Sequence, residues 1–129
     1  MSVVAKLSLL LLALLVLHVA DHSVFHAGSA EGATSVVGLL GLASVAAVAG
    51  LALAGPRLAP APAAIVGFGT ALGFVVVHLA PSWSAVSDPY PGAGLNAISW
   101  TSMSAALVTG FALGLAALAE LRRTPLAAP

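Results

Sequence analysis

The sequence predicts an all-α integral membrane protein, folded as a bundle of four transmembrane helices in a single domain, residues 1–129. Hydrophobic residues make up 60% of the chain and charged residues only 6%, whereas a soluble domain carries about 25% charged residues. The few charged residues leave three long uncharged stretches, at 32–56, 58–87 and 89–119. Gly and Pro gather between them, where helices are expected to end.

The first helix is predicted over residues 3–25. The apolar run between Lys6 and Asp21 is shorter than the roughly 20 residues that cross a bilayer. We therefore expect Lys6 to extend its ammonium group back to the interface. A cleaved signal peptide is the competing interpretation, but in a cut after Ala20 the third residue before the cut would be His18, where cleavage requires a small residue.

Three more helices are predicted, over 34–54, 62–80 and 96–120, one in each uncharged stretch. A short turn with Gly55, Pro56 and Pro60 separates the second helix from the third. A longer loop at 81–95, rich in Pro, Gly, Ser and aromatic residues, separates the third from the fourth. Asn96 or Ser99 is placed to cap the last helix.

Two glycine pairs, Gly69 with Gly73 and Gly110 with Gly114, have the spacing that lets helix backbones approach closely. Such spacings also arise by chance in a chain this rich in Ala and Gly. They indicate tight packing without specifying a dimer.

The four basic residues predict the orientation. Lys6 precedes the first helix, Arg57 lies in the short turn, and Arg122 and Arg123 follow the fourth helix. All four fall on one side of the bundle, and the positive-inside rule makes that side cytoplasmic. The sequence therefore predicts a multi-pass protein of the cell membrane with both termini and the short turn cytoplasmic, and with two longer extracytoplasmic loops.

The histidines are the main candidates for chemistry. His18 and His22 lie at or near the outer end of the first helix, and His78 lies near the outer end of the third. Asp21 shares a helical face with His18 and His22, because residues three and four apart are neighbours. We predict His18, Asp21, His22 and His78 as ligands of a divalent metal ion. His26 falls beyond the first helix, in the loop.

Other interpretations of this cluster remain open. His18 and His78, at similar depths on different helices, could be the axial ligands of a haem b. The histidines could also serve a proton relay, or simply lie at the membrane interface with their polar tips in water. A serine nucleophile on the fourth helix would need a base in reach, and no Gly-x-Ser-x-Gly motif is present. Trp83 and Tyr90 are typical interface anchors, in a loop that could also cover the histidines.

Composition narrows the function. The four basic and four acidic residues cancel, and cysteine is absent, which argues against nucleic-acid binding and thiol chemistry. The inner parts of the helices carry no charge, unlike a typical channel or carrier. The leading hypothesis is a non-enzymatic accessory or scaffold subunit that contacts the lipid bilayer and packs against a protein partner, or another copy, through its Gly/Ala-rich helices. The alternative is a haem- or metal-binding protein for electron transfer or metal handling.

Overall fold

A computed structural model describes residues 1–25, 33–55, 57–91, 93 and 95–123. Its described part is entirely helical apart from turns and loops, and contains no strand. Four helices are long and apolar enough to cross a membrane, which confirms the predicted fold class at that level. They are α1 (Val3–Phe25), α2 (Ala33–Ala54), α3 (Pro60–Phe74), which continues directly into the π-helical segment η1 (Val75–Leu79), and α4 (Ala97–Arg123).

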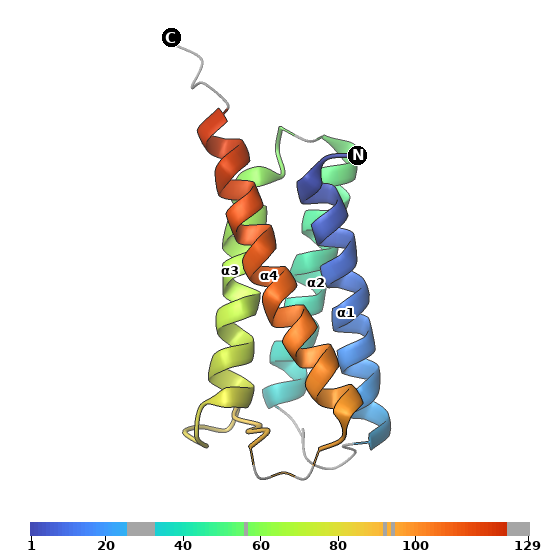
Figure 1. Ribbon diagram of the computed structural model, residues 1–129, viewed down its shortest axis with the longest axis vertical. Helices are drawn as coiled ribbons and strands as arrows, with labels where there is room; N and C mark the ends of the chain where they lie inside the picture. The colour runs from blue at the N-terminus through green and yellow to red at the C-terminus, as the bar shows by residue number, and fades with distance from the viewer. Residues whose placement is uncertain (26–32, 56, 92, 94, 124–129) are drawn as a thin grey trace.

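The four helices run side by side along the length of the molecule (Figure 1). The start of α1, the α2–α3 turn and the end of α4 lie at one end of the bundle, and the segment joining η1 to α4 lies at the other. All four basic residues therefore lie at or near the first end. We call the opposite end, where η1 stops and α4 starts, the loop end.

The ends of α3 and α4 follow simple local rules. Pro60 takes the first position of α3, where a missing N–H loses no intrahelical bond, so the predicted start at Pro62 lies inside the first turn. Asn96 caps α4: its Oδ1 accepts hydrogen bonds from the backbone N–H groups of Ile98 (2.8 Å) and Ser99 (3.0 Å).

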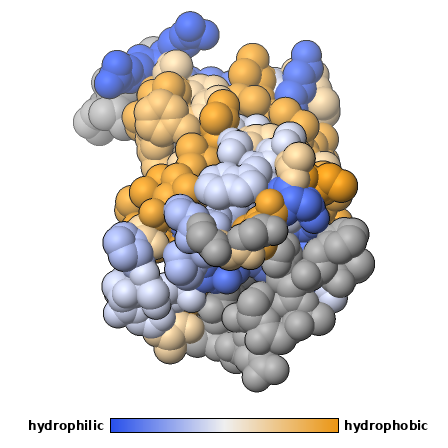
Figure 2. Space-filling model, turned by 60° about the horizontal axis from the view of Figure 1, so that its bottom comes forward, coloured by the Kyte–Doolittle hydropathy of each residue, from blue (hydrophilic) through white to orange (hydrophobic). Residues whose placement is uncertain are grey.

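Small residues take part of the core, beside larger ones such as Leu11 and Leu113, while many large apolar residues point outward. Ala63, Ala106 and Ala117 are fully buried, whereas Ile65, Leu72, Val108, Phe111 and Leu115 are exposed. A protein in water would lose stability by exposing so many large side chains. A membrane protein gains instead from small residues at helix interfaces. Figure 2 shows the hydrophobic flanks behind a more hydrophilic loop end.

Only one of the two predicted glycine pairs packs against a helix. A Cβ atom at Gly110 would lie 3.0 Å from the Gly67 carbonyl oxygen, and one at Gly114 would lie 2.8 Å from the Phe68 ring. Glycines on both helices, Gly67 on α3 and Gly110 and Gly114 on α4, therefore allow the two backbones to approach closely. Gly69 and Gly73 face open space, with nothing within 4 Å of an added Cβ.

Candidate metal centre

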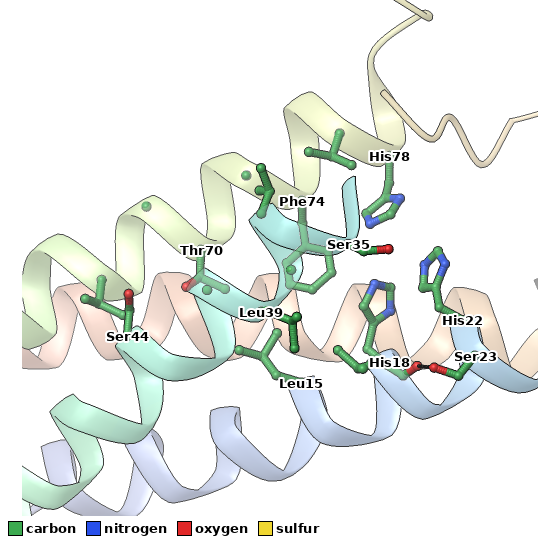
Figure 3. Close-up of a pocket in the computed structure, with 18 residues that line it drawn as sticks. Leu15, His18, His22, Ser23, Ser35, Leu39, Ser44, Thr70, Phe74 and His78 are labelled. Atoms are coloured by element: carbon green, nitrogen blue, oxygen red, sulfur yellow. Dashed lines mark hydrogen bonds between the residues drawn. The ribbon is translucent and has the colours of Figure 1, made fainter. Parts of the chain in front are cut away.

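Three histidines meet at the loop end of the bundle. The ring centroids of His18 and His22 are 4.6 Å apart, those of His18 and His78 are 5.1 Å apart, and those of His22 and His78 are 5.5 Å apart. Each residue offers a ring nitrogen that lies within 4.8 Å of the nitrogens of the other two. His18 and His78 are only 7% and 5% exposed. Figure 3 shows the three rings pointing toward one another from α1 and η1.

Helix geometry explains how the rings converge. His18 and His22 are four residues apart and project from the same face of α1. His78 comes from η1, where the Ala80 N–H donates to the Val75 carbonyl (2.9 Å) in the wider π-helical pattern. Single π turns inside α-helices occur frequently at functional sites. The Phe74 ring, one turn earlier, packs edge-on against His18 at 4.9 Å.

The segment after η1 folds back over the end of that helix. A helix leaves its last carbonyl groups without intrahelical partners. Here the Trp83 indole N–H donates to the Val76 carbonyl (3.0 Å). The Asp88 N–H donates to the Val77 carbonyl (2.9 Å), and the Tyr90 N–H donates to the His78 carbonyl (2.8 Å). Because these bonds cap the helix, they also hold Asp88 and Tyr90 beside the histidines.

The contact between His78 and Asp88 defines which nitrogen of His78 can bind a ligand. The Nδ1 atom of His78 lies 2.9 Å from the backbone carbonyl oxygen of Asp88. A carbonyl oxygen only accepts, so Nδ1 must carry the proton and donate it. The Nε2 atom then keeps its lone pair. Metal-binding histidines usually donate their second N–H to a carbonyl or carboxylate in this way.

His22 has two polar neighbours. Its Nε2 atom lies 3.1 Å from the Tyr90 hydroxyl, and its Nδ1 atom lies 3.6 Å from Oδ2 of Asp88. The same Asp88 oxygen lies 3.8 Å from Nδ1 of His78. One carboxylate thus faces two of the three imidazoles.

Tyr90 is a residue of the site that the sequence placed only in a loop that could cover the histidines, without predicting its contacts with them. It was expected to lie at the membrane interface, but it is 2% exposed and packs against His78 at 4.5 Å and Trp100 at 5.4 Å. Burial, together with the negative charges of Asp21 and Asp88, raises the pKa of Tyr90 above its ordinary value, so its hydroxyl keeps its proton. Nothing in the sequence distinguishes it from Trp83, whose side chain is 58% exposed.

The structure brings three of the four predicted metal ligands together. Among the residues that the structure describes, the group of possible ligand atoms that lie close to one another comes from His18, His22 and His78, and neither Asp21 nor Asp88 belongs to it. Asp21 is buried, at 4% exposed. His26 lies outside the described residues. The arrangement offers three imidazoles with carboxylates nearby, a set of groups suited to zinc, copper, iron or nickel.

A cavity of about 480 Å³ begins at the histidines and continues between α1, α2 and α3. All three histidines line one end of it, and Leu15, Leu39 and Phe74 are among the apolar residues along its walls (Figure 3).

Comparison with known proteins gives no relative on which to base an assignment: no protein-family model, curated protein or solved structure matches the chain.

Proposed function

We propose that this protein binds a divalent transition-metal ion through His18, His22 and His78, within a four-helix membrane bundle. Support comes from three ring nitrogens within 4.8 Å of one another, carried on two different helical segments. Three histidines leave a position open for water or a substrate, as in metal sites that react or exchange their ions. The function thus falls in the class of metal handling.

The observation that carries this proposal is the hydrogen bond from Nδ1 of His78 to the Asp88 carbonyl. The hydrogen bond sets the tautomer in which Nε2 of His78 keeps its lone pair, and the His78 ring faces His18 and His22 (Figure 3). The negative charge of Asp88 close to His22 and His78 compensates part of the charge of an incoming cation.

The packing of the rings favours a single ion over haem b. Two axial histidines of a haem lie on opposite faces of the macrocycle, so nothing can occupy the plane between them. The His22 ring lies 4.6 Å from His18 and 5.5 Å from His78, in contact with both members of the predicted axial pair. A haem would have to displace it, whereas an ion uses it as a third ligand.

The distribution of charge supports a location at the extracytoplasmic face of the cell membrane. The basic residues lie at the end of the bundle opposite the histidines (Figure 1), and cytoplasmic loops carry the excess of Lys and Arg in membrane proteins. We infer that both termini are cytoplasmic and that the metal centre faces the outside.

The decisive experiment measures metal content directly. The protein is purified in mild detergent without chelators, stripped, reloaded with Zn²⁺, and analysed by elemental mass spectrometry. We expect one Zn²⁺ per chain, lost in the His78→Ala variant and kept in Ser8→Ala, which removes a buried hydroxyl on α1 that is bonded to Val4 instead. A wild-type chain that retains no zinc, copper, iron or nickel after loading would overturn the proposal.

An accessory or scaffold subunit is the second candidate, and α2 favours it. Only 22% of its span is buried inside the bundle, against 33–39% for the other three helices. Helix α2 therefore has the most surface free for a protein partner or for another copy. If this function holds, purification from native membranes should recover a second protein in fixed ratio to the chain, or a stable homo-oligomer.

A further inference from the structure

The cavity beside the histidines has the size and shape of a ligand-binding site. Its volume of about 480 Å³ falls in the range of small-molecule sites. It extends along η1 and α3 from His78 to Val66, roughly 18 Å at 1.5 Å per residue. The space is long and has one polar end, where the imidazoles lie.

Glycines keep the cavity open. Gly38 and Gly41 of α2 and Gly69 and Gly73 of α3 all line it, and a Cβ atom added to any of them would meet nothing within 4 Å. This is the opposite of the α3–α4 contact, where added Cβ atoms would clash with the facing helix. Between α2 and α3, therefore, glycine leaves room that neither helix fills.

The walls define one part of the ligand. Leu15, Val66, Phe74 and Val77 give the cavity an apolar lining, and burying apolar surface is the main favourable contribution to binding in such a site. Gly38 and Leu39 are exposed at its edge, so the space communicates with the outer surface of the helices, where lipid would lie. A molecule dissolved in the membrane can reach it from the side.

The charges define the other part. Asp88 lies beside the histidine end, and every Lys and Arg lies toward the opposite end of the bundle. In the metal-free protein, a carboxylate or phosphate head group would be repelled at this end. An uncharged head group with carbonyl or hydroxyl oxygens can instead exchange hydrogen bonds with imidazoles or with the Ser35 hydroxyl, which Figure 3 places at the same end.

We propose that the cavity binds an uncharged amphiphile of the long-chain quinone type. Its oxygen-bearing head would lie at the histidines and its apolar tail between the glycine faces of α2 and α3. The inference goes beyond metal binding and does not depend on it, because it rests on the shape, lining and charge of the cavity.

The test is a titration of the purified, metal-free protein with a decyl-substituted benzoquinone. Dodecanoate, an anionic amphiphile of similar length, is titrated for comparison. Gly73→Leu and Gly69→Leu fill the cavity at two depths. Gly50→Leu is the matched control, since Gly50 is a helical glycine of α2 with open space around it that does not line the cavity. We expect saturable quinone binding in the wild type and in Gly50→Leu, and at least a tenfold weaker affinity in both cavity variants.

Three results would overturn the inference: no quinone binding to the wild type, equal affinity in wild type and in both cavity variants, or dodecanoate binding as tightly as the quinone. Circular dichroism and gel filtration establish that each variant is folded. Zinc content measured on the same samples separates the two proposals. Metal without quinone binding contradicts only the cavity proposal, and quinone without metal binding contradicts only the metal centre.

Discussion

The hydroxyl of Tyr90 lies 3.1 Å from Nε2 of His22, which joins the loop after η1 to the end of α1. A phenol is protonated at neutral pH, and burial and the nearby carboxylates raise the pKa of Tyr90 further. Tyr90 also donates its backbone N–H to the His78 carbonyl. One loop residue thus contacts His22 and His78 and also lies near His18, so the proposed metal site would depend on it.

Loss of a ligand is expected to abolish the site without unfolding the bundle. His18→Ala removes one of three imidazoles, so Zn²⁺ affinity should fall by more than 100-fold. The stability of the apoprotein in detergent should change little, because the helices pack mainly through other residues. Competition with a chromogenic chelator measures the affinity, and thermal unfolding measures the stability. Equal zinc affinity in His18→Ala and wild type would reject His18 as a ligand.

The supporting residues should have smaller effects. Asp88→Asn removes the carboxylate charge but keeps the backbone carbonyl that accepts from His78. Outer-shell substitutions typically lower metal affinity by about 10–100-fold, and we expect a loss within that range. The same chelator competition applies. Asp88→Asn with unchanged affinity, alongside a weakened His18→Ala, would show that the charge has no part in binding.

Tyr90→Phe separates the hydroxyl from the ring. The substitution keeps the aromatic contacts with His78 and Trp100 and removes only the hydrogen bond to His22. We expect the bundle to stay folded. The zinc affinity should fall by about tenfold, the lower end of the losses seen when an outer-shell partner is removed. Tyr90→Ala, which also removes the packing, should reduce thermal stability as well. A Phe variant as unstable as the Ala variant would argue against this division of roles.

Two neighbouring glycines of α3 should respond oppositely to alanine. A Cβ atom at Gly67 would lie 2.7 Å from the Gly110 carbonyl oxygen and 2.7 Å from the Gly114 nitrogen. Backbone cannot move aside cheaply, so Gly67→Ala should destabilise the protein by about 1–3 kcal/mol or more. Gly69→Ala meets open space and should be neutral or stabilise the helix by up to about 1 kcal/mol. Thermal unfolding in detergent compares the two, and a Gly69→Ala variant as unstable as Gly67→Ala would contradict the assigned packing.

The absence of cysteine makes topology easy to test with single substitutions. Ser84→Cys lies in the exposed segment at the histidine end, and Leu58→Cys lies in the exposed α2–α3 turn at the other. In intact cells, a membrane-impermeant maleimide should label Ser84→Cys, and it should label Leu58→Cys only after the membrane is permeabilised. The reverse pattern would place the metal centre in the cytoplasm.

The sequence predicts the helices well and the grouping of the histidines in part. The spacing of Lys6, Asp21, Arg57 and Asp88 marks the uncharged stretches, and each yields an apolar helix because backbone hydrogen bonds must be satisfied within a span. The placement of His18, His22 and His78 at one end of the bundle also follows from their positions near the ends of α1 and η1. Their meeting across the bundle, between helices that make little direct contact, does not follow from the sequence. The spacing of charges and the position of a residue along its helix are local properties, so they can be predicted from the sequence.

The remaining features depend on non-local contacts. Whether Gly69 and Gly73 meet a helix or a cavity depends on which faces of α2 and α3 turn toward each other, and uniformly apolar helices carry no pattern that fixes this rotation. The fold of the loop depends on bonds from Trp83, Asp88 and Tyr90 to carbonyls of η1. Every residue has the same backbone carbonyl acceptor, so no sequence motif indicates which carbonyls accept these hydrogen bonds.

The hydrogen bonds between this loop and the end of η1 also bear on how well the proposed site is ordered before an ion binds. Lifting the loop from the bundle breaks four of them, at a net free energy of about 1 kcal/mol each. The opened form is then populated at about 0.1%, before the buried contacts of the Tyr90 ring are counted. An ion would therefore meet a His78 ring that is already held in place, and little of its binding free energy would be lost in ordering the site.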